Sequence, residues 1–181
     1  MRRRALISVF VKDGVLELAS FLHKNDWEIL STGGTAKYLV EQGVPVTDVS
    51  AVTEFPECLD GRVKTLHPKV HAGILAIRDK AAHMDSLNQL GVAPIDLVCV
   101  NLYPLFDKVQ AGLSFEETVK FIDIGGPTML RSAAKNWQDV AVVVDPADYD
   151  TVLEQLRESG EVSRETKLKL CYKVFAHTAQ Y

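Results

Sequence analysis

Apolar and polar residues follow one another along the chain in two distinct patterns. Residues 5–11, ALISVFV, form an apolar run rich in β-branched residues, which is typical of a strand. Val15, Leu18, Ala19 and Leu22 then recur at positions i, i+3, i+4 and i+7, the spacing of one helix face. The beginning of the chain therefore predicts a strand followed by a helix.

The same alternation continues to the end of the chain. The further predicted elements are a strand at 27–30, a helix at 35–42 ended by Gly43, a short strand around Val46, a helix at 83–91, a strand at 95–103, a helix with a capping box at Ser114 and Glu117, a helix at 125–137, a strand at 139–145 and two amphipathic helices. Such alternation predicts an α/β fold with a mainly parallel sheet covered by helices on both faces. Ligands of such sheets bind beyond the carboxyl ends of the strands.

Two of the later helices show apolar stripes that we expect to face the core. The stripes are Leu130, Ala133, Ala134 and Trp137 in the helix at 125–137, and Leu168, Cys171, Tyr172 and Phe175 in the last helix.

The stretch from Phe55 to Leu75 fits neither pattern, and we treat it as a loop. Apolar residues recur in it among glycines and prolines, and ionisable residues are dense. These are Asp60, Arg62, Lys64, His67, Lys69 and His71. A connection that only joined two elements would not need so many charges, so we expect this stretch to contribute to a binding site.

Composition narrows the class of protein. A length of 181 residues, 47% of them hydrophobic, is typical of one soluble domain, and the net charge of −4 argues against a nucleic-acid partner. The longest apolar runs, such as residues 140–144, are too short to span a membrane, and no signal peptide is expected. Cys58, Cys99 and Cys171 form no C-x-x-C pair, which indicates a reducing compartment, the cytoplasm.

Two glycine turns are the first candidate sites. Thr32, Gly33, Gly34 and Thr35 lie between a strand and a helix, where backbone N–H groups and the helix dipole favour a phosphate. A plain glycine turn capped by Thr35 explains the pattern equally well. Neither a Walker A loop nor a G-x-G-x-x-G motif exists in the chain.

The second turn, Gly125 and Gly126, has an acid beside it, Asp123. In the helix that follows, Thr128, Arg131 and Lys135 form a polar row, which a solvated helix face explains as well as a binding site does.

Further candidate groups stand at the predicted strand end and in the Phe55–Leu75 stretch. Asn101 and Tyr103, in NLYP, are placed to hydrogen-bond either a ligand or loop backbone groups. Arg62 offers a planar fork for phosphate, and Lys64 is a point donor. His67 and His71 lack a third ligand in the pattern, so no metal site is expected.

Four of these motifs, in order, resemble the IMP cyclohydrolase domain of the bifunctional purine-biosynthesis enzyme AICAR transformylase/IMP cyclohydrolase. They are STGGTAKYL, LDGRVKTLHPKVHAGIL, NLYP and IDIGGPTMLRSAAKN, and the closing FAHTAQY is similar as well. The resemblance implies a three-layer α/β/α sandwich of the methylglyoxal-synthase-like kind, formed by a single domain at residues 1–181 without the family's C-terminal transformylase domain.

The resemblance also implies an activity. The substrate would be 5-formamido-1-(5-phosphoribosyl)imidazole-4-carboxamide (FAICAR), whose ring closes to IMP with loss of water in the last step of de novo purine synthesis. No cofactor or metal is implied, and the expected assembly is a homodimer.

Residue roles are carried over by motif. The implied catalytic group is Lys64, Tyr103, Asp123 and Lys135, with Lys135 as general acid/base, Asp123 positioning Lys135 or the carboxamide, and Lys64 with Asn101 or Tyr103 stabilising the formyl oxyanion. The phosphate would lie on Thr32, Gly33, Gly34 and Thr35, helped by Ser8, Lys12, Arg62 and Thr65. Backbone groups of Val63, Ile124, Gly125 and Gly126 would frame the base.

One departure from the family pattern and two alternatives remain. The family reads S-V-S-D-K-T-G where this chain reads SVFVKDG, so Phe10 and Val11 replace a serine and an aspartate near the phosphate. The first alternative is a methylglyoxal-synthase-like lyase, but the S-G-P-L-G-G-D signature of that family is absent from this chain. A non-catalytic nucleotide-binding regulatory module of the same fold has no need of both DGRVKTLHP and IDIGG.

Overall fold

The computed structural model describes residues 1–103 and 105–181, so Pro104 of the NLYP motif lies outside the described residues. Within the described part, parallel strands form one five-stranded sheet in the order β3-β2-β1-β4-β5. The strands are β1 (Arg4–Ser8), β2 (Glu28–Ser31), β3 (Thr47–Asp48), β4 (Leu97–Val100) and β5 (Ala141–Val143).

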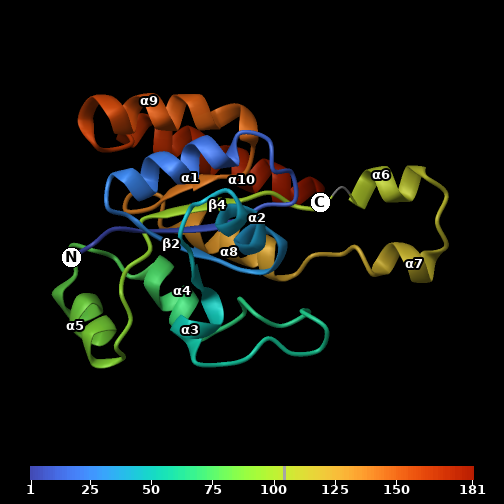
Figure 1. Cartoon of the computed structure of the whole chain (residues 1–181), viewed down its shortest axis with the longest axis horizontal. Coiled ribbons are helices and arrows are strands. Elements are labelled where there is room, and N and C mark those ends of the chain that lie inside the picture. The colour runs from blue at the N-terminus through green and yellow to red at the C-terminus, as the bar shows by residue number, and fades with distance from the viewer. Residues whose placement is uncertain (104) are drawn as a thin grey trace.

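Helices cover both faces of this sheet. They are α1 (Val15–Lys24), α2 (Gly33–Glu41), α3 (Val49–Thr53), α4 (Pro68–Leu75), α5 (Ala81–Gln89), α6 (Leu105–Gln110), α7 (Phe115–Val119), α8 (Gly125–Lys135), α9 (Tyr149–Ser159) and α10 (Arg164–Gln180), with a 3-10 turn, η1 (Pro146–Asp148), before α9. In Figure 1, α1 and α9 lie on one side of the strands and α4 and α8 on the other. The predicted three-layer α/β fold with a parallel sheet is confirmed.

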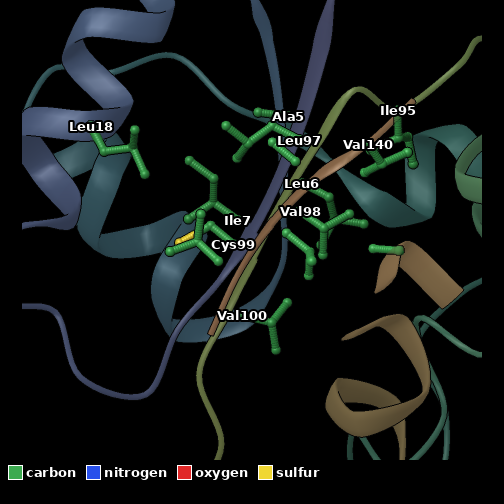
Figure 2. Close-up of a cluster of buried hydrophobic side chains, with 14 of the residues drawn as sticks. Ala5, Leu6, Ile7, Leu18, Ile95, Leu97, Val98, Cys99, Val100 and Val140 are labelled. Carbon is green, nitrogen blue, oxygen red and sulfur yellow. The ribbon is translucent and has the colours of Figure 1, made fainter. Parts of the chain in front are cut away.

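The central strands are buried on both faces, as a three-layer arrangement requires. Leu6 pairs in register with Val98, and Ile7 with Cys99, and all four are fully buried. Figure 2 shows the two pairs on opposite sides of the strands, with Leu18 of α1 on the side of Ile7. Helices on both faces thus pack against one sheet, which holds the loops at its carboxyl edge in fixed positions.

Several predicted elements differ from the observed ones in ways that matter for the site. The strand β1 ends at Ser8, and Phe10 and Val11 are exposed, so the apolar run ALISVFV is strand only in its first part. The stretch Phe55–Leu75 is not loop throughout, because α4 forms within it. Pro68 occupies the first turn of α4, and His67 accepts a hydrogen bond from Lys69 N–H as the N-cap.

The buried face of the last helix was predicted only in part, since Cys171 is the one buried residue of the predicted stripe. Leu170, Cys171 and Val174 of α10 are buried, whereas Tyr172 is 76% exposed and Leu168 is 51% exposed. A helix that packs on both α8 and β5 buries a different face from the one that the most apolar residues mark. The stripe in α8 was predicted correctly, since Leu130, Ala133 and Ala134 are fully buried.

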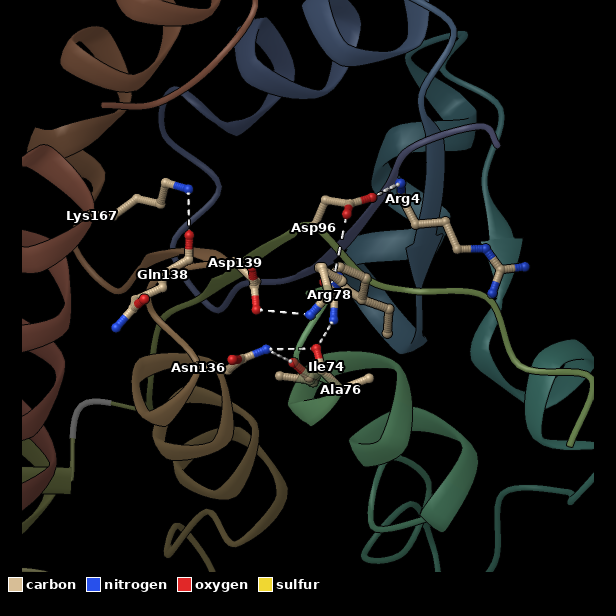
Figure 3. Close-up of polar contacts among 10 residues, drawn as sticks. Arg4, Ile74, Ala76, Arg78, Asp96, Asn136, Gln138, Asp139 and Lys167 are labelled. Carbon is tan, nitrogen blue, oxygen red and sulfur yellow. Dashed lines mark hydrogen bonds and ion pairs between the residues drawn. The ribbon is translucent and has the colours of Figure 1, made fainter. Parts of the chain in front are cut away.

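A polar cluster fixes the edge of the sheet at which the strands begin (Figure 3). The Arg78 guanidinium donates to the Ile95 carbonyl at 2.7 Å, and Arg78 N–H donates to Asp139 at 3.1 Å. Asn136, directly after α8, donates to carbonyl oxygens at the end of α4. Asp96 accepts from Arg4 N–H at 3.0 Å, and burial raises the pKa of the Asp96 carboxyl. The carboxyl edge of the sheet is thereby left for the loops that carry the motifs.

Two helices project from the body of the molecule. Figure 1 shows α6 and α7 as a separate pair to the right of the sheet, and we call residues 105–124 the arm. Along the described chain, no helix combines the length and the apolar composition that crossing a bilayer requires.

Candidate active site

A cleft of about 550 Å³ lies at the carboxyl edge of the sheet. It lies at the carboxyl ends of the neighbouring strands β1 and β4. The strand order reverses there, because β2 and β3 are added on one side of β1 and β4 and β5 on the other. Such a switch point is the ordinary binding position of open parallel sheets. The volume is in the range of small-molecule pockets. Fifteen of the residues proposed from the sequence line the cleft, namely Ser8, Lys12, Thr32, Gly33, Gly34, Thr35, Arg62, Lys64, Thr65, Asn101, Tyr103, Asp123, Ile124, Gly125 and Gly126.

The Thr32–Thr35 turn opens α2 and points its first backbone N–H groups at the cleft. Gly33 has a φ of +55°, a conformation that favours glycine. An alanine methyl at Gly34 would meet no described atom within 4 Å, so packing in the described structure does not explain this second glycine. The unfilled space leaves room for a ligand to approach the backbone. These features fit an anion at the N-terminus of α2.

Thr35 and Asn101 use their side chains within the protein. The Thr35 hydroxyl bonds both the N–H and the carbonyl of Val9, each at 3.0 Å. Asn101 Oδ1 accepts from Phe10 N–H at 2.6 Å and from Val11 N–H at 3.0 Å. Both side chains therefore shape the turn after β1. That arrangement is the alternative use of Asn101, to satisfy loop backbone groups.

The replacement of a serine by Phe10 changes the rim of the cleft. The Phe10 ring packs against the Tyr103 ring with their centroids 4.9 Å apart. Backbone N–H groups at Phe10 and Val11 are held by Asn101, so the turn does not depend on the side chains that differ from the family pattern. Phe10 is 46% exposed and Tyr103 is 45% exposed, so the phenol of Tyr103 stands at an open, partly apolar rim.

The Phe55–Leu75 stretch delivers a cation to the phosphate turn. Cys58 and Val63 form an antiparallel bridge around a tight turn. From this turn the Lys64 ammonium extends to within 3.3 Å of the point where a side chain on Gly33 would begin. Glu57 lies 3.7 Å from the same ammonium. The Lys64 charge thus stands beside the Gly33 turn, nearer to the predicted phosphate than the sequence suggested.

The charge balance of the cleft is positive although the chain as a whole is negative. Its basic lining residues are Lys12, Arg62, Lys64 and Lys120, and its acidic ones are Asp60 and Asp123. Burial lowers the pKa of the Lys12 ammonium, which donates to the carbonyl oxygens of Val9 and Phe10. A local excess of cations favours an anionic ligand.

Asp123, Gly125 and Gly126 also line the cleft. Asp123 Oδ1 accepts from Gly126 N–H, in the first turn of α8, at 3.1 Å. A methyl group on Gly126 would lie 2.3 Å from Asp123 Oδ2, and one on Gly125 would lie 2.6 Å from the Thr65 hydroxyl. A side chain at either position would displace one of these groups, so the two glycines let Thr65 and Asp123 lie close to the start of α8.

Two of the predicted residues do not line the cleft. Val63 lies in the bridge behind Lys64. Lys135 is the last residue of α8, ten residues beyond Gly125, or about 15 Å along the helix. It precedes Asn136 of the polar cluster at the other edge of the sheet, and it is exposed. Within one chain, Lys135 therefore does not meet Asp123.

The structure adds residues that the sequence did not indicate. Among them are Lys120, Phe121 and Ile122, all from the arm. The end of the arm is hydrogen-bonded to Tyr181, 58 to 60 residues later, and no local sequence pattern indicated this contact. Asp60, by contrast, belongs to the quoted DGRVKTLHP motif and was available as a candidate.

The two candidate metal-binding histidines point to different partners. His67 caps α4, and His71 Nδ1 lies 3.0 Å from the Ser132 hydroxyl of α8. Throughout residues 1–103 and 105–181, no group of three or more His, Cys, Asp or Glu side chains is placed to hold a metal ion.

Comparisons with known proteins agree over the whole chain. Residues 14–128 match the MGS-like domain, and residues 133–181 match the AICARFT/IMPCHase bienzyme. The chain is 61% identical over 181 residues to the bifunctional purine biosynthesis protein PurH of Clostridium acetobutylicum, and 60% identical over 181 residues to that of Clostridium beijerinckii. All of the chain is covered in both cases, but it spans only 36% of the length of either relative.

A solved structure is similar as well. The protein described as ForH is 34% identical in sequence, with a TM-score of 0.86. The match covers 100% of this chain and 95% of that one.

Proposed function

This chain belongs to the family of MGS-like domains found in the bifunctional purine biosynthesis protein PurH, and on that premise we propose that its cleft closes FAICAR to IMP. The observation that carries the proposal is the polarity of the cleft. It combines a cationic glycine turn with hydrogen-bonding groups on other segments of the chain, Asp123 and Tyr103. A ligand that joins a phosphate to a flat, polar base fits both. The proposed domain is the whole of residues 1–181, and the proposed setting is the cytoplasm, since the cysteines are free thiols.

The reaction requires two proton transfers and the loss of one water molecule. The carboxamide nitrogen bonds to the formyl carbon and gives up a proton, while the formyl oxygen gains negative charge and is protonated. That oxygen then leaves as water as the former formamide nitrogen loses its proton, and a C=N bond forms. Both reacting groups belong to one molecule, so holding them in the reactive rotamer supplies much of the rate.

We assign the roles by position in the cleft. Asp123 accepts the carboxamide proton, because its carboxylate lines the cleft and is oriented by the Gly126 N–H. The Tyr103 phenol donates to the formyl oxygen from the rim. Lys64, Lys12 and the N-terminus of α2 hold the phosphate.

Products separate this proposal from its two alternatives. In separate incubations with FAICAR and with dihydroxyacetone phosphate, the chain should form IMP from the first and no methylglyoxal from the second. Because no metal or folate is part of the proposed chemistry, excess chelator should leave the rate unchanged. A chain that binds IMP but converts neither compound is a regulatory module, and a chelator effect reversed by one metal contradicts the proposed chemistry.

The open space at Gly34 gives a prediction that separates binding from stability. Gly34→Ala should leave the free energy of unfolding unchanged or raise it by about 0.5–1 kcal/mol, since alanine favours the helix. The methyl should nevertheless keep a phosphate from the backbone and weaken IMP by about 10–10²-fold, the loss of one charged hydrogen bond. Thermal unfolding and calorimetric titration with IMP measure the two effects. Unaltered IMP affinity would place the phosphate elsewhere.

We propose that the arm binds a second copy of this chain, which would form the expected homodimer. Phe115 is 79% exposed, Phe106 55% and Val109 54%, on helices that project from the body. Exposed apolar groups gathered on one projection are typical of an interface.

A second copy would also give Lys135 a role that its own chain does not allow. If Lys135 moves protons, as the resemblance implies, it does so in the cleft of the other copy. Asp123→Asn and Lys135→Ala should then each be impaired, and an equal mixture should recover about a quarter of wild-type activity, since half the dimers would hold one intact cleft. No recovery on mixing, or full activity of Lys135→Ala alone, would exclude this role.

A further inference from the structure

The tyrosine that follows α10 reaches back to the cleft wall. The hydroxyl of Tyr181 accepts a hydrogen bond from Asp123 N–H at 2.8 Å and donates one to the Phe121 carbonyl at 3.1 Å. The hydroxyl thus uses its donor and an acceptor site on one short backbone segment, 58 to 60 residues away in sequence. The motif FAHTAQY, of which Tyr181 is the end, has no part in the site described above.

This segment is where the arm rejoins the body. Phe121 and Asp123 line the cleft between α7 and the first turn of α8. In Figure 1 the C-terminus lies beside the root of the arm, in agreement with the hydrogen bonds. Asp123 is therefore held at two points. Its side chain accepts from Gly126 N–H, and its own N–H donates to Tyr181.

The side chain of Tyr181 is held in place by packing. Its ring packs against the main core, and Val174, two turns earlier in α10, is fully buried. The Cys171 thiol donates to the Ala134 carbonyl at 3.2 Å, and the Arg131 guanidinium lies 5.2 Å from the centre of the Phe175 ring, so α10 is fastened to α8. Because α8 begins at Gly125, two residues after Asp123, the contacts between α10 and α8 also fix the position of Tyr181 relative to this part of the cleft. Burial raises the pKa of the Tyr181 hydroxyl, which keeps its proton for the Phe121 carbonyl.

We propose that Tyr181 is a positioning residue, which fixes the Phe121–Asp123 segment and so holds the Asp123 carboxylate at the reacting end of the cleft. Its catalytic consequence rests on the proposed function. A carboxylate displaced by about 1 Å loses the alignment on which proton transfer depends. The phosphate turn lies on a different loop, after β2, and does not depend on this tyrosine.

The test compares Tyr181→Phe with Tyr172→Phe, which removes a hydroxyl from a 76%-exposed ring on α10, the helix that Tyr181 follows. Amide exchange by nuclear magnetic resonance reads the Asp123 N–H directly. In Tyr181→Phe this amide should exchange at least about tenfold faster, and kcat for FAICAR should fall by about 10–10²-fold with KM within about threefold. Tyr172→Phe should match the wild-type chain in all three. Amides of β4 should exchange alike in every variant, which excludes a general loss of stability.

Each other result decides against the proposal or narrows it. Unchanged exchange at Asp123 would show that the hydroxyl does not hold the segment. Faster exchange with unchanged kcat would show that the segment needs no such fixing, and an equal loss in Tyr172→Phe would point to α10 as a whole. If the wild-type chain does not convert FAICAR, the proposed function fails, whereas faster exchange at Asp123 in Tyr181→Phe alone still supports Tyr181 as the fastening of this segment.

Discussion

Replacing Asp123 with asparagine should lower kcat for FAICAR ring closure by about 10²–10⁴-fold, the range for a lost general acid or base. The amide keeps an oxygen that can accept from Gly126 N–H, so the first turn of α8 should survive. What is lost is the ability to take the carboxamide proton. Affinity for IMP should be unchanged or higher, because removal of a negative charge from the cleft favours a phosphate. Steady-state kinetics and calorimetry separate the two quantities.

Asp60 provides the matched control for this prediction. Among the described residues, it is the other acidic one that lines the cleft. It stands in the turn before Arg62, in a left-handed conformation that asparagine also adopts. Asp60→Asn should therefore change kcat by less than about threefold, as expected for a charge that takes no part in proton transfer. A larger loss in Asp60→Asn than in Asp123→Asn would mean that the base lies on the Phe55–Leu75 stretch.

Lys64→Ala should weaken IMP by about 10–10²-fold, as expected for one lost charged hydrogen bond. The reason is the position of the ammonium beside the Gly33 turn. KM for FAICAR should rise in parallel, because the phosphate is common to substrate and product. Calorimetric titration of IMP and steady-state kinetics on the same preparation measure both changes.

Arg62→Ala is the comparison that can overturn this assignment. Arg62 is exposed at the edge of the same cleft, and we expect its removal to weaken IMP less than the removal of Lys64 does. The family resemblance implied the reverse, with Arg62 on the phosphate and Lys64 on the formyl oxyanion. If Lys64→Ala lowers kcat and leaves IMP affinity intact, the reverse assignment is the correct one.

Local patterns were sufficient to predict the layers of the fold and the edge of the sheet that carries the site. The helix at 15–22 and the buried strand around Cys99 follow from apolar spacing alone, because burial on a sheet imposes that spacing. The glycine turn at Gly33 was recognisable for the same kind of reason, since few other residues allow the backbone to turn so closely after a strand. Gly125 follows the arm instead of a strand, and its small size matters because the Thr65 hydroxyl approaches it closely.

The use of individual polar groups was not predictable in this way. Thr35 and Asn101 accept hydrogen bonds from backbone N–H groups in the turn after β1, and they lie 26 and 91 residues beyond their partners in sequence. Lys120 lines the cleft from the end of the arm, which local patterns also did not predict. The distance of Lys135 from Asp123, however, was available from helix geometry, because ten residues of helix extend about 15 Å.

The most direct test of the central claim is the rate at which the purine chromophore appears when FAICAR is mixed with this chain alone, in chelator and without folate. We predict turnover far above the uncatalysed rate, at least about 10⁶-fold, inhibited competitively by IMP and depressed in Asp123→Asn. A rate equal to that in buffer, from folded protein that binds IMP, would contradict the account. All the groups to which we assign the chemistry would then be present in one cleft, yet no reaction would occur.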